Sequence, residues 1–280
     1  MTIPDLGRGI GFLGGGHMGR ALIAALLRRG FEPSRLLVAE SHRDTARALI
    51  ADFGIVTVDR SDELPGRVDS VVLAVKPQDL AAALQPLQSG LAQHRPLLIS
   101  VAAGITLAQL QQWCGDESLP MVRAMPNRPA MTGFGATGLY APSTLEPQLR
   151  QRAVAILETA GIVVPVEQEA LLDVVTAVSG SGPAYFFRLA EALAAAGVAQ
   201  GLPADAALRL ARATLQGAGS MATPEADLVA LRESVTSKGG TTAAALAAFS
   251  TLGFEQMVER AVEAAVQRGR DLATQANRGS

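Results

Sequence analysis

Hydroxyl groups and glycines are concentrated in one loop near the carboxyl end of the chain, at residues 236–242. The loop reads T-S-K-G-G-T-T and leads into an alanine-rich apolar run at residues 243–249, which predicts a helix. Paired glycines let a backbone turn sharply and approach a ligand, and the first N–H groups of a helix have no partner within it. The loop is therefore expected to bind a small anion such as a carboxylate. Helix capping by Ser237 and Thr242 is the alternative, and it needs no ligand.

A second glycine loop lies near the amino end, where Gly14, Gly16 and Gly19 fit the pattern G-x-G-x-x-G. It follows an apolar run at residues 10–13 and precedes a helical pattern at residues 21–29, as a dinucleotide-binding loop requires. In such loops the first glycine permits a tight turn, the second lets the pyrophosphate approach, and the third lets helix and strand pack closely. The sequence predicts an NAD(P)-binding site here.

The end of the second predicted strand carries residues that would select between the two nicotinamide cofactors. Glu40 lies about 20 residues after Gly19, where an acid usually binds the ribose 2′-hydroxyl. Ser41 and Arg43 follow it, and both are suited to bind a 2′-phosphate. These residues do not decide between NADH and NADPH as the cofactor. A solvated helix face is an equally good interpretation of Arg43 and Arg47.

Further candidate loops follow other predicted strands, at residues 74–77, 100–104 and 123–127. Open α/β sheets bind their ligands beyond the carboxyl ends of the strands, so we expect cofactor contacts from these loops. The complete set of predicted cofactor-binding residues is Gly14, Gly15, Gly16, His17, Met18, Glu40, Ser41, Arg43, Val75, Lys76, Pro77, Ala102 and Pro126.

The predicted secondary structure that positions these loops changes near residue 166, from alternating strands and helices to helices alone. Before it, helical stretches alternate with short apolar runs that predict parallel strands buried on both faces, at residues 10–13, 36–39, 71–75, 97–101, 122–125 and 161–166. Beyond it, apolar residues recur at helical spacing, apart from one ambiguous stretch at residues 172–178. We therefore predict an α/β fold class, with a Rossmann-like doubly wound sheet over residues 1–166 and an all-α oligomerisation domain over residues 167–280.

Composition argues against several classes of function. The 280 residues include 24 Lys and Arg against 26 Asp and Glu, a formal charge of −2, with no basic stripe to bind nucleic acid. One cysteine cannot form an intrachain disulfide, and three histidines this far apart cannot hold a metal ion. No apolar run approaches the roughly 18 residues that span a bilayer, and no signal-peptide pattern is evident. We expect a cytoplasmic protein that binds no nucleic acid, metal or membrane.

Five motifs together resemble the pyrroline-5-carboxylate reductase family. They are G-G-G-H-M at residues 14–18, A-V-K-P at 74–77, R-A-M-P-N at 123–127, V-S-G-S-G-P-A-Y at 178–185 and V-T-S-K-G-G-T-T at 235–242. The resemblance covers essentially the whole chain. Two positions depart from the family pattern, because His17 stands where Asn is usual and Lys238 stands where Pro is common.

The resemblance implies an enzyme that reduces 1-pyrroline-5-carboxylate to L-proline with hydride from NAD(P)H, the last step of proline biosynthesis, with a slight preference for NADPH. Little acid–base chemistry is required of the protein, because the imine can be protonated before it binds. By similarity, Thr242 is the catalytic residue, which orients the ring or relays a proton. The substrate-binding residues implied by similarity are Ser237, Gly239, Gly240, Thr241 and Thr242.

A homodimer, or an assembly built from dimers, is expected on two grounds. The helices predicted within residues 183–219 are rich in alanine and glycine, with few bulky side chains to close a core alone. The family resemblance implies the same association through the C-terminal helices.

Two other classes of protein share parts of this pattern. β-Hydroxyacid dehydrogenases and related imine reductases have a similar layout but use a lysine on a substrate-domain helix, and the predicted helix at residues 183–196 contains none. A nucleotide-binding sensor or scaffold would keep the first glycine loop without catalysis. The intact loop at residues 236–242 argues against that alternative.

Overall fold

The structure is a computed structural model that describes residues 6–223 and 225–278. The chain forms two compact units, which are treated separately below. The first contains the chain up to Gly180 together with the chain from Ala265 onward, and the second is Ser181–Ala264. The expected division of domains at residue 166 stays a prediction.

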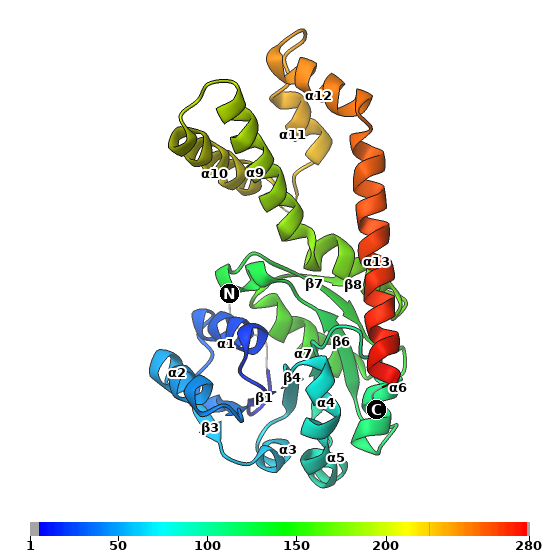
Figure 1. The fold of residues 1–280 in the computed structure, drawn as a ribbon. Coiled ribbons are helices and arrows are strands. Elements are labelled where there is room, and N and C mark those ends of the chain that lie inside the picture. The colour runs from blue at the N-terminus through cyan, green and yellow to red at the C-terminus, as the bar shows by residue number, and fades with distance from the viewer. Residues whose placement is uncertain (1–5, 224, 279–280) are drawn as a thin grey trace. The chain divides into compact units, whose positions relative to one another are not determined.

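The first unit is built on a single sheet with the strand order β3-β2-β1-β4-β5-β6-β7-β8 (Figure 1). Its strands are β1 (Ile10–Leu13), β2 (Leu36–Ala39), β3 (Val56–Val58), β4 (Ser70–Leu73), β5 (Leu97–Ser100), β6 (Met121–Met125), β7 (Gly135–Tyr140) and β8 (Gly161–Pro165). Strands β1 to β6 are parallel, whereas β7 is antiparallel to β6 and parallel to β8. The chain order reverses beside β1, and this is the point at which doubly wound sheets bind dinucleotides.

The α/β fold class with a helical C-terminal part is confirmed, but the sheet differs from the expectation in two ways. Strands β3 and β7 lie where no strand was predicted, because V-T-V is short and the G-A-T-G-L-Y of β7 contains two glycines, which are rare in strands. The sheet is also not entirely parallel, since β7 and β8 run opposite to the other strands. An apolar run predicts a buried strand but carries no information on its direction.

Helices cover both faces of this sheet. They are α1 (His17–Arg28), α2 (Arg43–Phe53), α3 (Leu64–Arg67), α4 (Pro77–Leu84), α5 (Gln88–His94), α6 (Leu107–Cys114), α7 (Pro147–Glu158) and α8 (Leu171–Val175). Short 3₁₀ turns lie at Pro33–Arg35, Ser61–Glu63, Gln85–Leu87 and Arg128–Thr132, and a π-helical turn at Thr176–Gly180 follows α8.

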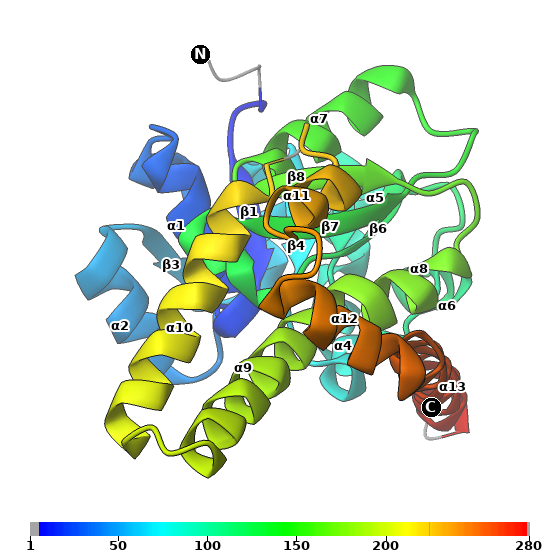
Figure 2. The ribbon, with the colours of Figure 1, turned by 90° about the horizontal axis from the view of Figure 1, so that it is seen from above.

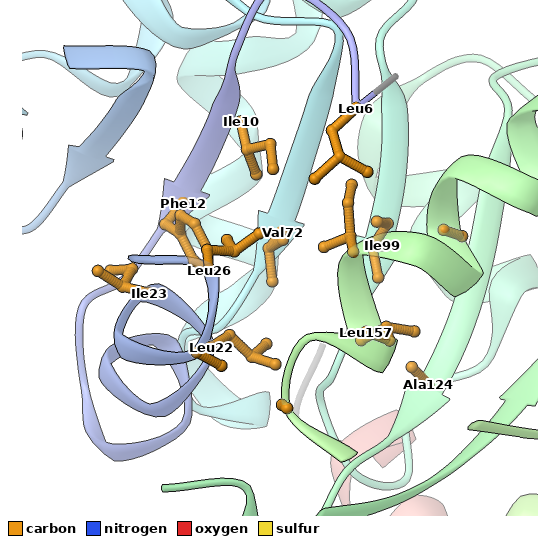
Figure 3. Packing of buried hydrophobic residues seen from close by; sticks show 14 of the residues in the cluster. Leu6, Ile10, Phe12, Leu22, Ile23, Leu26, Val72, Ile99, Ala124 and Leu157 are labelled. Atoms are coloured by element: carbon orange, nitrogen blue, oxygen red, sulfur yellow. The ribbon is translucent and has the colours of Figure 1, made fainter. Parts of the chain in front are cut away.

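Alternation along the strands divides the apolar core into two layers. Ile10 and Phe12 of β1 pack with Leu22 and Leu26 of α1 and with Leu157 of α7 (Figure 3). The residues that alternate with them face the other layer, where Leu13 of β1 joins side chains from α3, α4, α5 and α6. Successive residues of one strand therefore fix helices on opposite faces, and the loops at the strand ends are held from both sides.

The second unit is helical. It contains α9 (Gly182–Ala199), α10 (Ala204–Met221), α11 (Leu228–Ser234), α12 (Thr241–Thr251) and the start of α13 (Phe254–Arg278). Helices α9 and α10 lie side by side in both views (Figure 2). Every element described between residues 171 and 278 is helical, which resolves the ambiguous stretch at residues 172–178 as α8 and the π-helical turn. Within the described part of the chain, no helix combines the length and apolar character needed to cross a membrane.

Candidate functional site

The glycine loop between β1 and α1 has the shape that its spacing predicts. Gly14 adopts a φ of +94°, in the left-handed region that favours glycine. Its N–H donates a hydrogen bond of 2.9 Å to the carbonyl of Ala39, at the end of the neighbouring strand β2. A Cβ at Gly14 would lie 2.8 Å from Cγ1 of Val75 in the loop after β4. The turn is therefore pressed against two neighbouring strand ends and has no room for a side chain.

The other glycines of the loop meet different surroundings. A Cβ on Gly16 would meet nothing within 4 Å, so this position opens onto free space at the start of α1. A Cβ on Gly19 would lie 2.6 Å from the carbonyl oxygen of Gly14, so α1 lies directly on the turn. Gly16 is also the N-cap residue of α1 and makes no side-chain cap. The N-terminus of α1 thus has the open cradle that a pyrophosphate requires.

Glu40 follows β2 and turns its carboxylate towards this loop. One oxygen accepts a hydrogen bond of 2.8 Å from the N–H of Gly15, and the other accepts one of 2.8 Å from the N–H of His42. The Glu40 side chain is only 8% exposed. Burial alone would raise the pKa of Glu40, but these N–H donors and the His42 ring outweigh it, so the pKa lies below its ordinary value. Glu40 is therefore held as a carboxylate that fixes the position of Gly15.

The residues after Glu40 are more accessible. Ser41 and Arg43 are exposed, and Arg43 is the first residue of α2. Arg47, one turn further along, lies 3.7 Å from the carboxylate of Asp44. Within the described part of the chain, Arg43 has no carboxylate within ion-pair distance. Its guanidinium therefore differs from that of Arg47 in having no anionic partner beside it.

Three more predicted loops follow β4, β5 and β6 at the same edge of the sheet. Lys76 is exposed and is the N-cap residue of α4, which begins at Pro77. Ala102 and Pro126 are buried behind the ends of β5 and β6. Of these loops, the one after β4 is directly beside the glycine loop, because β4 pairs with β1. The exposed His17 and half-buried Met18 open α1 on the other side of the turn.

Asn127 connects segments that sequence reasoning did not bring together. It is buried in the loop after β6, and its Oδ1 accepts a hydrogen bond of 2.9 Å from the N–H of Ala136 at the start of β7. Its Nδ2 donates one of 2.9 Å to the carbonyl of Ser179 in the π-helical turn. Asn127 lies within the R-A-M-P-N motif, but no spacing signal indicated these distant partners.

A partly buried ion pair holds the adjoining segment. Arg123 on β6 is almost fully buried, and its Nη1 lies 2.8 Å from Oε1 of Glu169. The same oxygen accepts a hydrogen bond of 2.7 Å from the N–H of Leu107, the first residue of α6. Glu169 therefore joins β6, the start of α6 and the connection from β8 to α8.

The second predicted loop lies in the helical unit. Gly239 has a φ of +72°, and Gly240 is the N-cap residue of α12 without a side-chain cap. The N–H of Gly240 donates a hydrogen bond of 3.0 Å to the carbonyl of Ser237, and a Cβ on Gly240 would lie 2.4 Å from Oγ of Ser237. The loop is thus a closed turn that brings the Ser237 hydroxyl to the start of α12.

The start of α12 carries further donors. The first hydrogen bond onto the cap residue runs from the N–H of Ala244 to the carbonyl of Gly240, over 3.2 Å. The N–H groups of Thr241, Thr242 and Ala243 precede it and have no acceptor within the helix. Gly240 is the N-cap residue and no side-chain cap hydrogen bond forms at this terminus, so the structure gives no support to helix capping as the role of Ser237 or Thr242. The hydroxyls and unpaired N–H groups together can bind an anion.

The single cysteine is unsuited to chemistry. Cys114 is buried at the end of α6. Burial, with a smaller contribution from the charge of Asp116, raises the pKa of its thiol to about 12. The thiolate is therefore scarce at neutral pH, and the nucleophile of a covalent mechanism is not supplied here.

Comparison with known proteins covers both units. Residues 9–104 match the family described as "NADP oxidoreductase coenzyme F420-dependent", and residues 169–272 match "Pyrroline-5-carboxylate reductase dimerisation". The chain is 40% identical over 267 residues to a protein of Pseudomonas aeruginosa named pyrroline-5-carboxylate reductase, covering 95% of this chain and 97% of that protein. The chain belongs to the pyrroline-5-carboxylate reductase family.

Solved structures of the family agree. The pyrroline-5-carboxylate reductase of Coxiella burnetii superposes with a TM-score of 0.90 at 35% identity, over 95% of this chain and 98% of that one. The Plasmodium falciparum enzyme, solved with NADP bound, gives a TM-score of 0.79 at 26% identity, over 95% and 98% of the two chains. Family members thus share the whole fold described above, and NAD(P)H is the cofactor of the family.

Proposed function

We propose that the chain reduces the C=N bond of 1-pyrroline-5-carboxylate to give L-proline, with hydride from NAD(P)H. The observation that carries this proposal is the open cradle at Gly16, where α1 begins on a turn pressed against β2 and β4. The family to which the chain belongs indicates the reaction. The open cradle at Gly16 offers a binding site for the cofactor that this reaction requires. Oxidation of the reduced nicotinamide, followed by its absorbance and dependent on the added imine, tests the proposal.

The cofactor would be held by the loops at the carboxyl ends of the strands. The N–H groups at the start of α1 would bind the pyrophosphate. Ser41 and Arg43 would meet the 2′-phosphate of NADPH, since both are exposed and Arg43 lies beside no carboxylate. Glu40 is engaged by Gly15 and His42, so it acts first as the support of the loop. We infer a preference for NADPH over NADH.

The substrate carboxylate would be bound by the loop at residues 237–242. The Ser237 hydroxyl and the N–H groups of Thr241 and Thr242 lie at the start of α12, where the helix dipole also favours an anion. Gly239 and Gly240 give the turn its shape, and the Gly240 N–H is engaged by Ser237 within it. Hydrogen bonds from these three donors to one carboxylate would fix the orientation of a small ring.

Thr242 would orient the imine nitrogen. Bound NAD(P)H would supply the hydride that the imine carbon accepts, and the C=N bond would become a C–N bond. The proton on nitrogen is carried by the protonated imine, so no strong acid is required of the protein. A threonine hydroxyl is a weak acid, and it suits hydrogen bonding to the ring nitrogen or relay of a proton from water.

The family match to a dimerisation region shows a homo-oligomer, and we propose that the assembly is a dimer or is built from dimers. A cytoplasmic address is part of the same proposal, since the substrate and cofactor belong to amino-acid synthesis. Light scattering on the purified chain tests the assembly, and a monomer with full activity would contradict it.

A further inference from the structure

The last two strands of the sheet share an apolar face. The register of β7 and β8 pairs Ala136 with Ile162 and Gly138 with Val164, and paired residues point to the same side of a sheet. Ile162 and Val164 are 50% and 51% exposed. Strand β8 is also the last strand in the order, so its outer edge has no neighbouring strand among the described residues. Exposed β-branched side chains on an edge strand favour association with another chain.

Helix α8 makes this face into a groove. A Cβ on Gly138 would lie 2.6 Å from Cγ1 of Val175, so the missing side chain lets α8 pack directly on β7. Beside this contact, the strands, α8 and the π-helical turn enclose an apolar groove of about 360 Å³. Leu171, Val174 and Val178 form its helical wall, and all three are exposed.

The groove has few features of a site for a small polar ligand. None of its lining residues is charged. The Ser179 hydroxyl in its wall donates a hydrogen bond of 3.0 Å to the carbonyl of Val175, at the end of α8. Small-molecule sites usually direct a few polar groups at the ligand. Apolar packing is therefore the main interaction that the groove offers.

Two observations indicate what covers it. The residues that match the dimerisation family, 169–272, include the whole helical wall of the groove, so the groove is continuous with a known region of self-association. The same chain also has helices with exposed apolar side chains, among them Phe186, Phe187 and Leu193 of α9. In a dimer with a two-fold axis, a contact between the groove of one chain and a helix of the other occurs twice, once for each chain.

We propose that the groove of β7, β8 and α8 is occupied by an apolar helix of a second copy of this chain. The dimer interface then includes a face of the β-sheet as well as the helices of the dimerisation region. This inference rests on the dimer in the proposed function, and it adds a surface contributed by residues 136–166, before the dimerisation match begins.

The test introduces a charge into the groove. Val174 is 37% exposed, so Val174→Asp leaves the isolated chain with a solvated carboxylate but places an unpaired charge in the dimer interface. We expect the dimer dissociation constant, measured by light scattering over a dilution series, to rise at least about 100-fold. Ile50→Asp on α2 is the matched control, because Ile50 is an aliphatic helix residue that is 46% exposed outside the groove. The control should dimerise as the wild type does.

Hydrogen exchange of β8 identifies the occupant. The amides of β8 that are not hydrogen-bonded to β7 should exchange more slowly in the wild-type dimer than in the Val174→Asp monomer. Unchanged dimerisation of Val174→Asp would overturn the proposal, and so would equally slow exchange of these β8 amides in the monomer, which would indicate cover by the chain's own helices. If circular dichroism shows that Val174→Asp does not fold, Val164→Lys decides in its place, since lysine is common on natural edge strands.

Imine reduction by the wild type is measured on the same samples. Wild type that forms dimers sensitive to Val174→Asp, but does not reduce the imine, would contradict the proposed reaction and leave the groove assignment standing. An active wild-type dimer that Val174→Asp does not weaken would contradict the groove assignment alone.

Discussion

The side-chain amide of Asn127 donates a hydrogen bond of 2.9 Å to the backbone carbonyl of Ser179, which lies 52 positions further along the chain. The bond joins the loop after β6 to the π-helical turn, and π-helical turns occur frequently at functional sites. Because Oδ1 of the same side chain accepts from the N–H of Ala136, one amide holds three segments in register.

Asn127→Asp should remove one of these two hydrogen bonds and keep the other. The carboxylate keeps an acceptor for the N–H of Ala136 but presents an oxygen, in place of a donor, to the carbonyl of Ser179. We expect the free energy of unfolding at pH 7 to fall by about 1–3 kcal/mol, because a buried acceptor loses its donor. Urea denaturation measures it, and Asn127→Ala, which loses both bonds without burying a charge, separates the loss of the bonds from the cost of a buried carboxylate. A stability equal to wild type for Asn127→Asp would show that the bond to Ser179 contributes little.

Gly16→Val should abolish cofactor binding without harming the fold. The new side chain meets no protein atom near its Cβ, yet it fills the cradle at the start of α1. Fluorescence titration with NADPH measures the affinity, and thermal denaturation measures the stability. Gly19→Val is the contrasting variant, because its Cβ would lie 2.6 Å from the Gly14 carbonyl and should destabilise the chain. Wild-type NADPH affinity in folded Gly16→Val would contradict the assignment of this loop.

Thr242→Ala should lower turnover and leave the melting temperature nearly unchanged, because Thr242 does not cap α12. Asp227→Ala is the control, since the Asp227 carboxylate caps α11 by accepting a hydrogen bond of 2.9 Å from the N–H of Val229. Loss of that cap should cost about 0.5–2 kcal/mol of stability. Steady-state kinetics and denaturation of both variants check the pair. Full turnover with a lowered melting temperature in Thr242→Ala would point to a structural role.

Arg43→Ala should weaken NADPH binding and leave NADH binding almost unchanged, because only NADPH carries the 2′-phosphate. Arg47→Ala is the matched control, because Arg47 lies on the same helix and beside Asp44. It should change neither affinity. Competition titrations with both cofactors make the comparison, and equal losses for NADPH and NADH in Arg43→Ala would exclude a 2′-phosphate contact.

The ionisation of Glu40 should make the stability of the folded chain depend on pH. Because its pKa is lower in the folded chain than the ordinary value of 4.5, the ionised carboxylate stabilises the fold. That contribution is complete above the ordinary pKa and is lost as the pH falls through the lower folded pKa. Stability measured from neutral pH downward should therefore decrease more steeply in wild type than in Glu40→Gln. If stability falls equally steeply with pH in wild type and in Glu40→Gln, the ionisation of Glu40 does not contribute to the stability of the fold.

The part of the fold that follows from local pattern was predictable. The strands β1, β2, β4, β5, β6 and β8 are near-continuous apolar runs, and the glycine spacing at residues 14–19 placed the turn before α1. The short β3 and the glycine-containing β7 have no such pattern, and strand direction leaves no trace in hydropathy. The pairing of strands in the folded sheet decided where β3 and β7 form and in which direction the strands run.

The geometry of the candidate loops followed from the sequence only in part. Sequence placed Glu40 and Gly15 among the cofactor loops, but not the hydrogen bond between them, because it depends on how β2 is aligned with β1. The hydroxyls at residues 236–242 indicated an anion site, whereas the engagement of the Gly240 N–H by Ser237 required the backbone. Asn127 was part of a motif whose partners only the fold brings near.

The buried thiol of Cys114 makes the chain suitable for site-directed labelling. Because burial raises the pKa of this thiol to about 12, little thiolate forms at pH 8, and maleimide or nitroxide reagents should not react with it. A cysteine introduced at an exposed position, such as Lys76→Cys, would then be the single labelled site in a protein that keeps all its native side chains elsewhere. Spectroscopic probes could report on cofactor loops and on pairs of subunits without first removing a native residue.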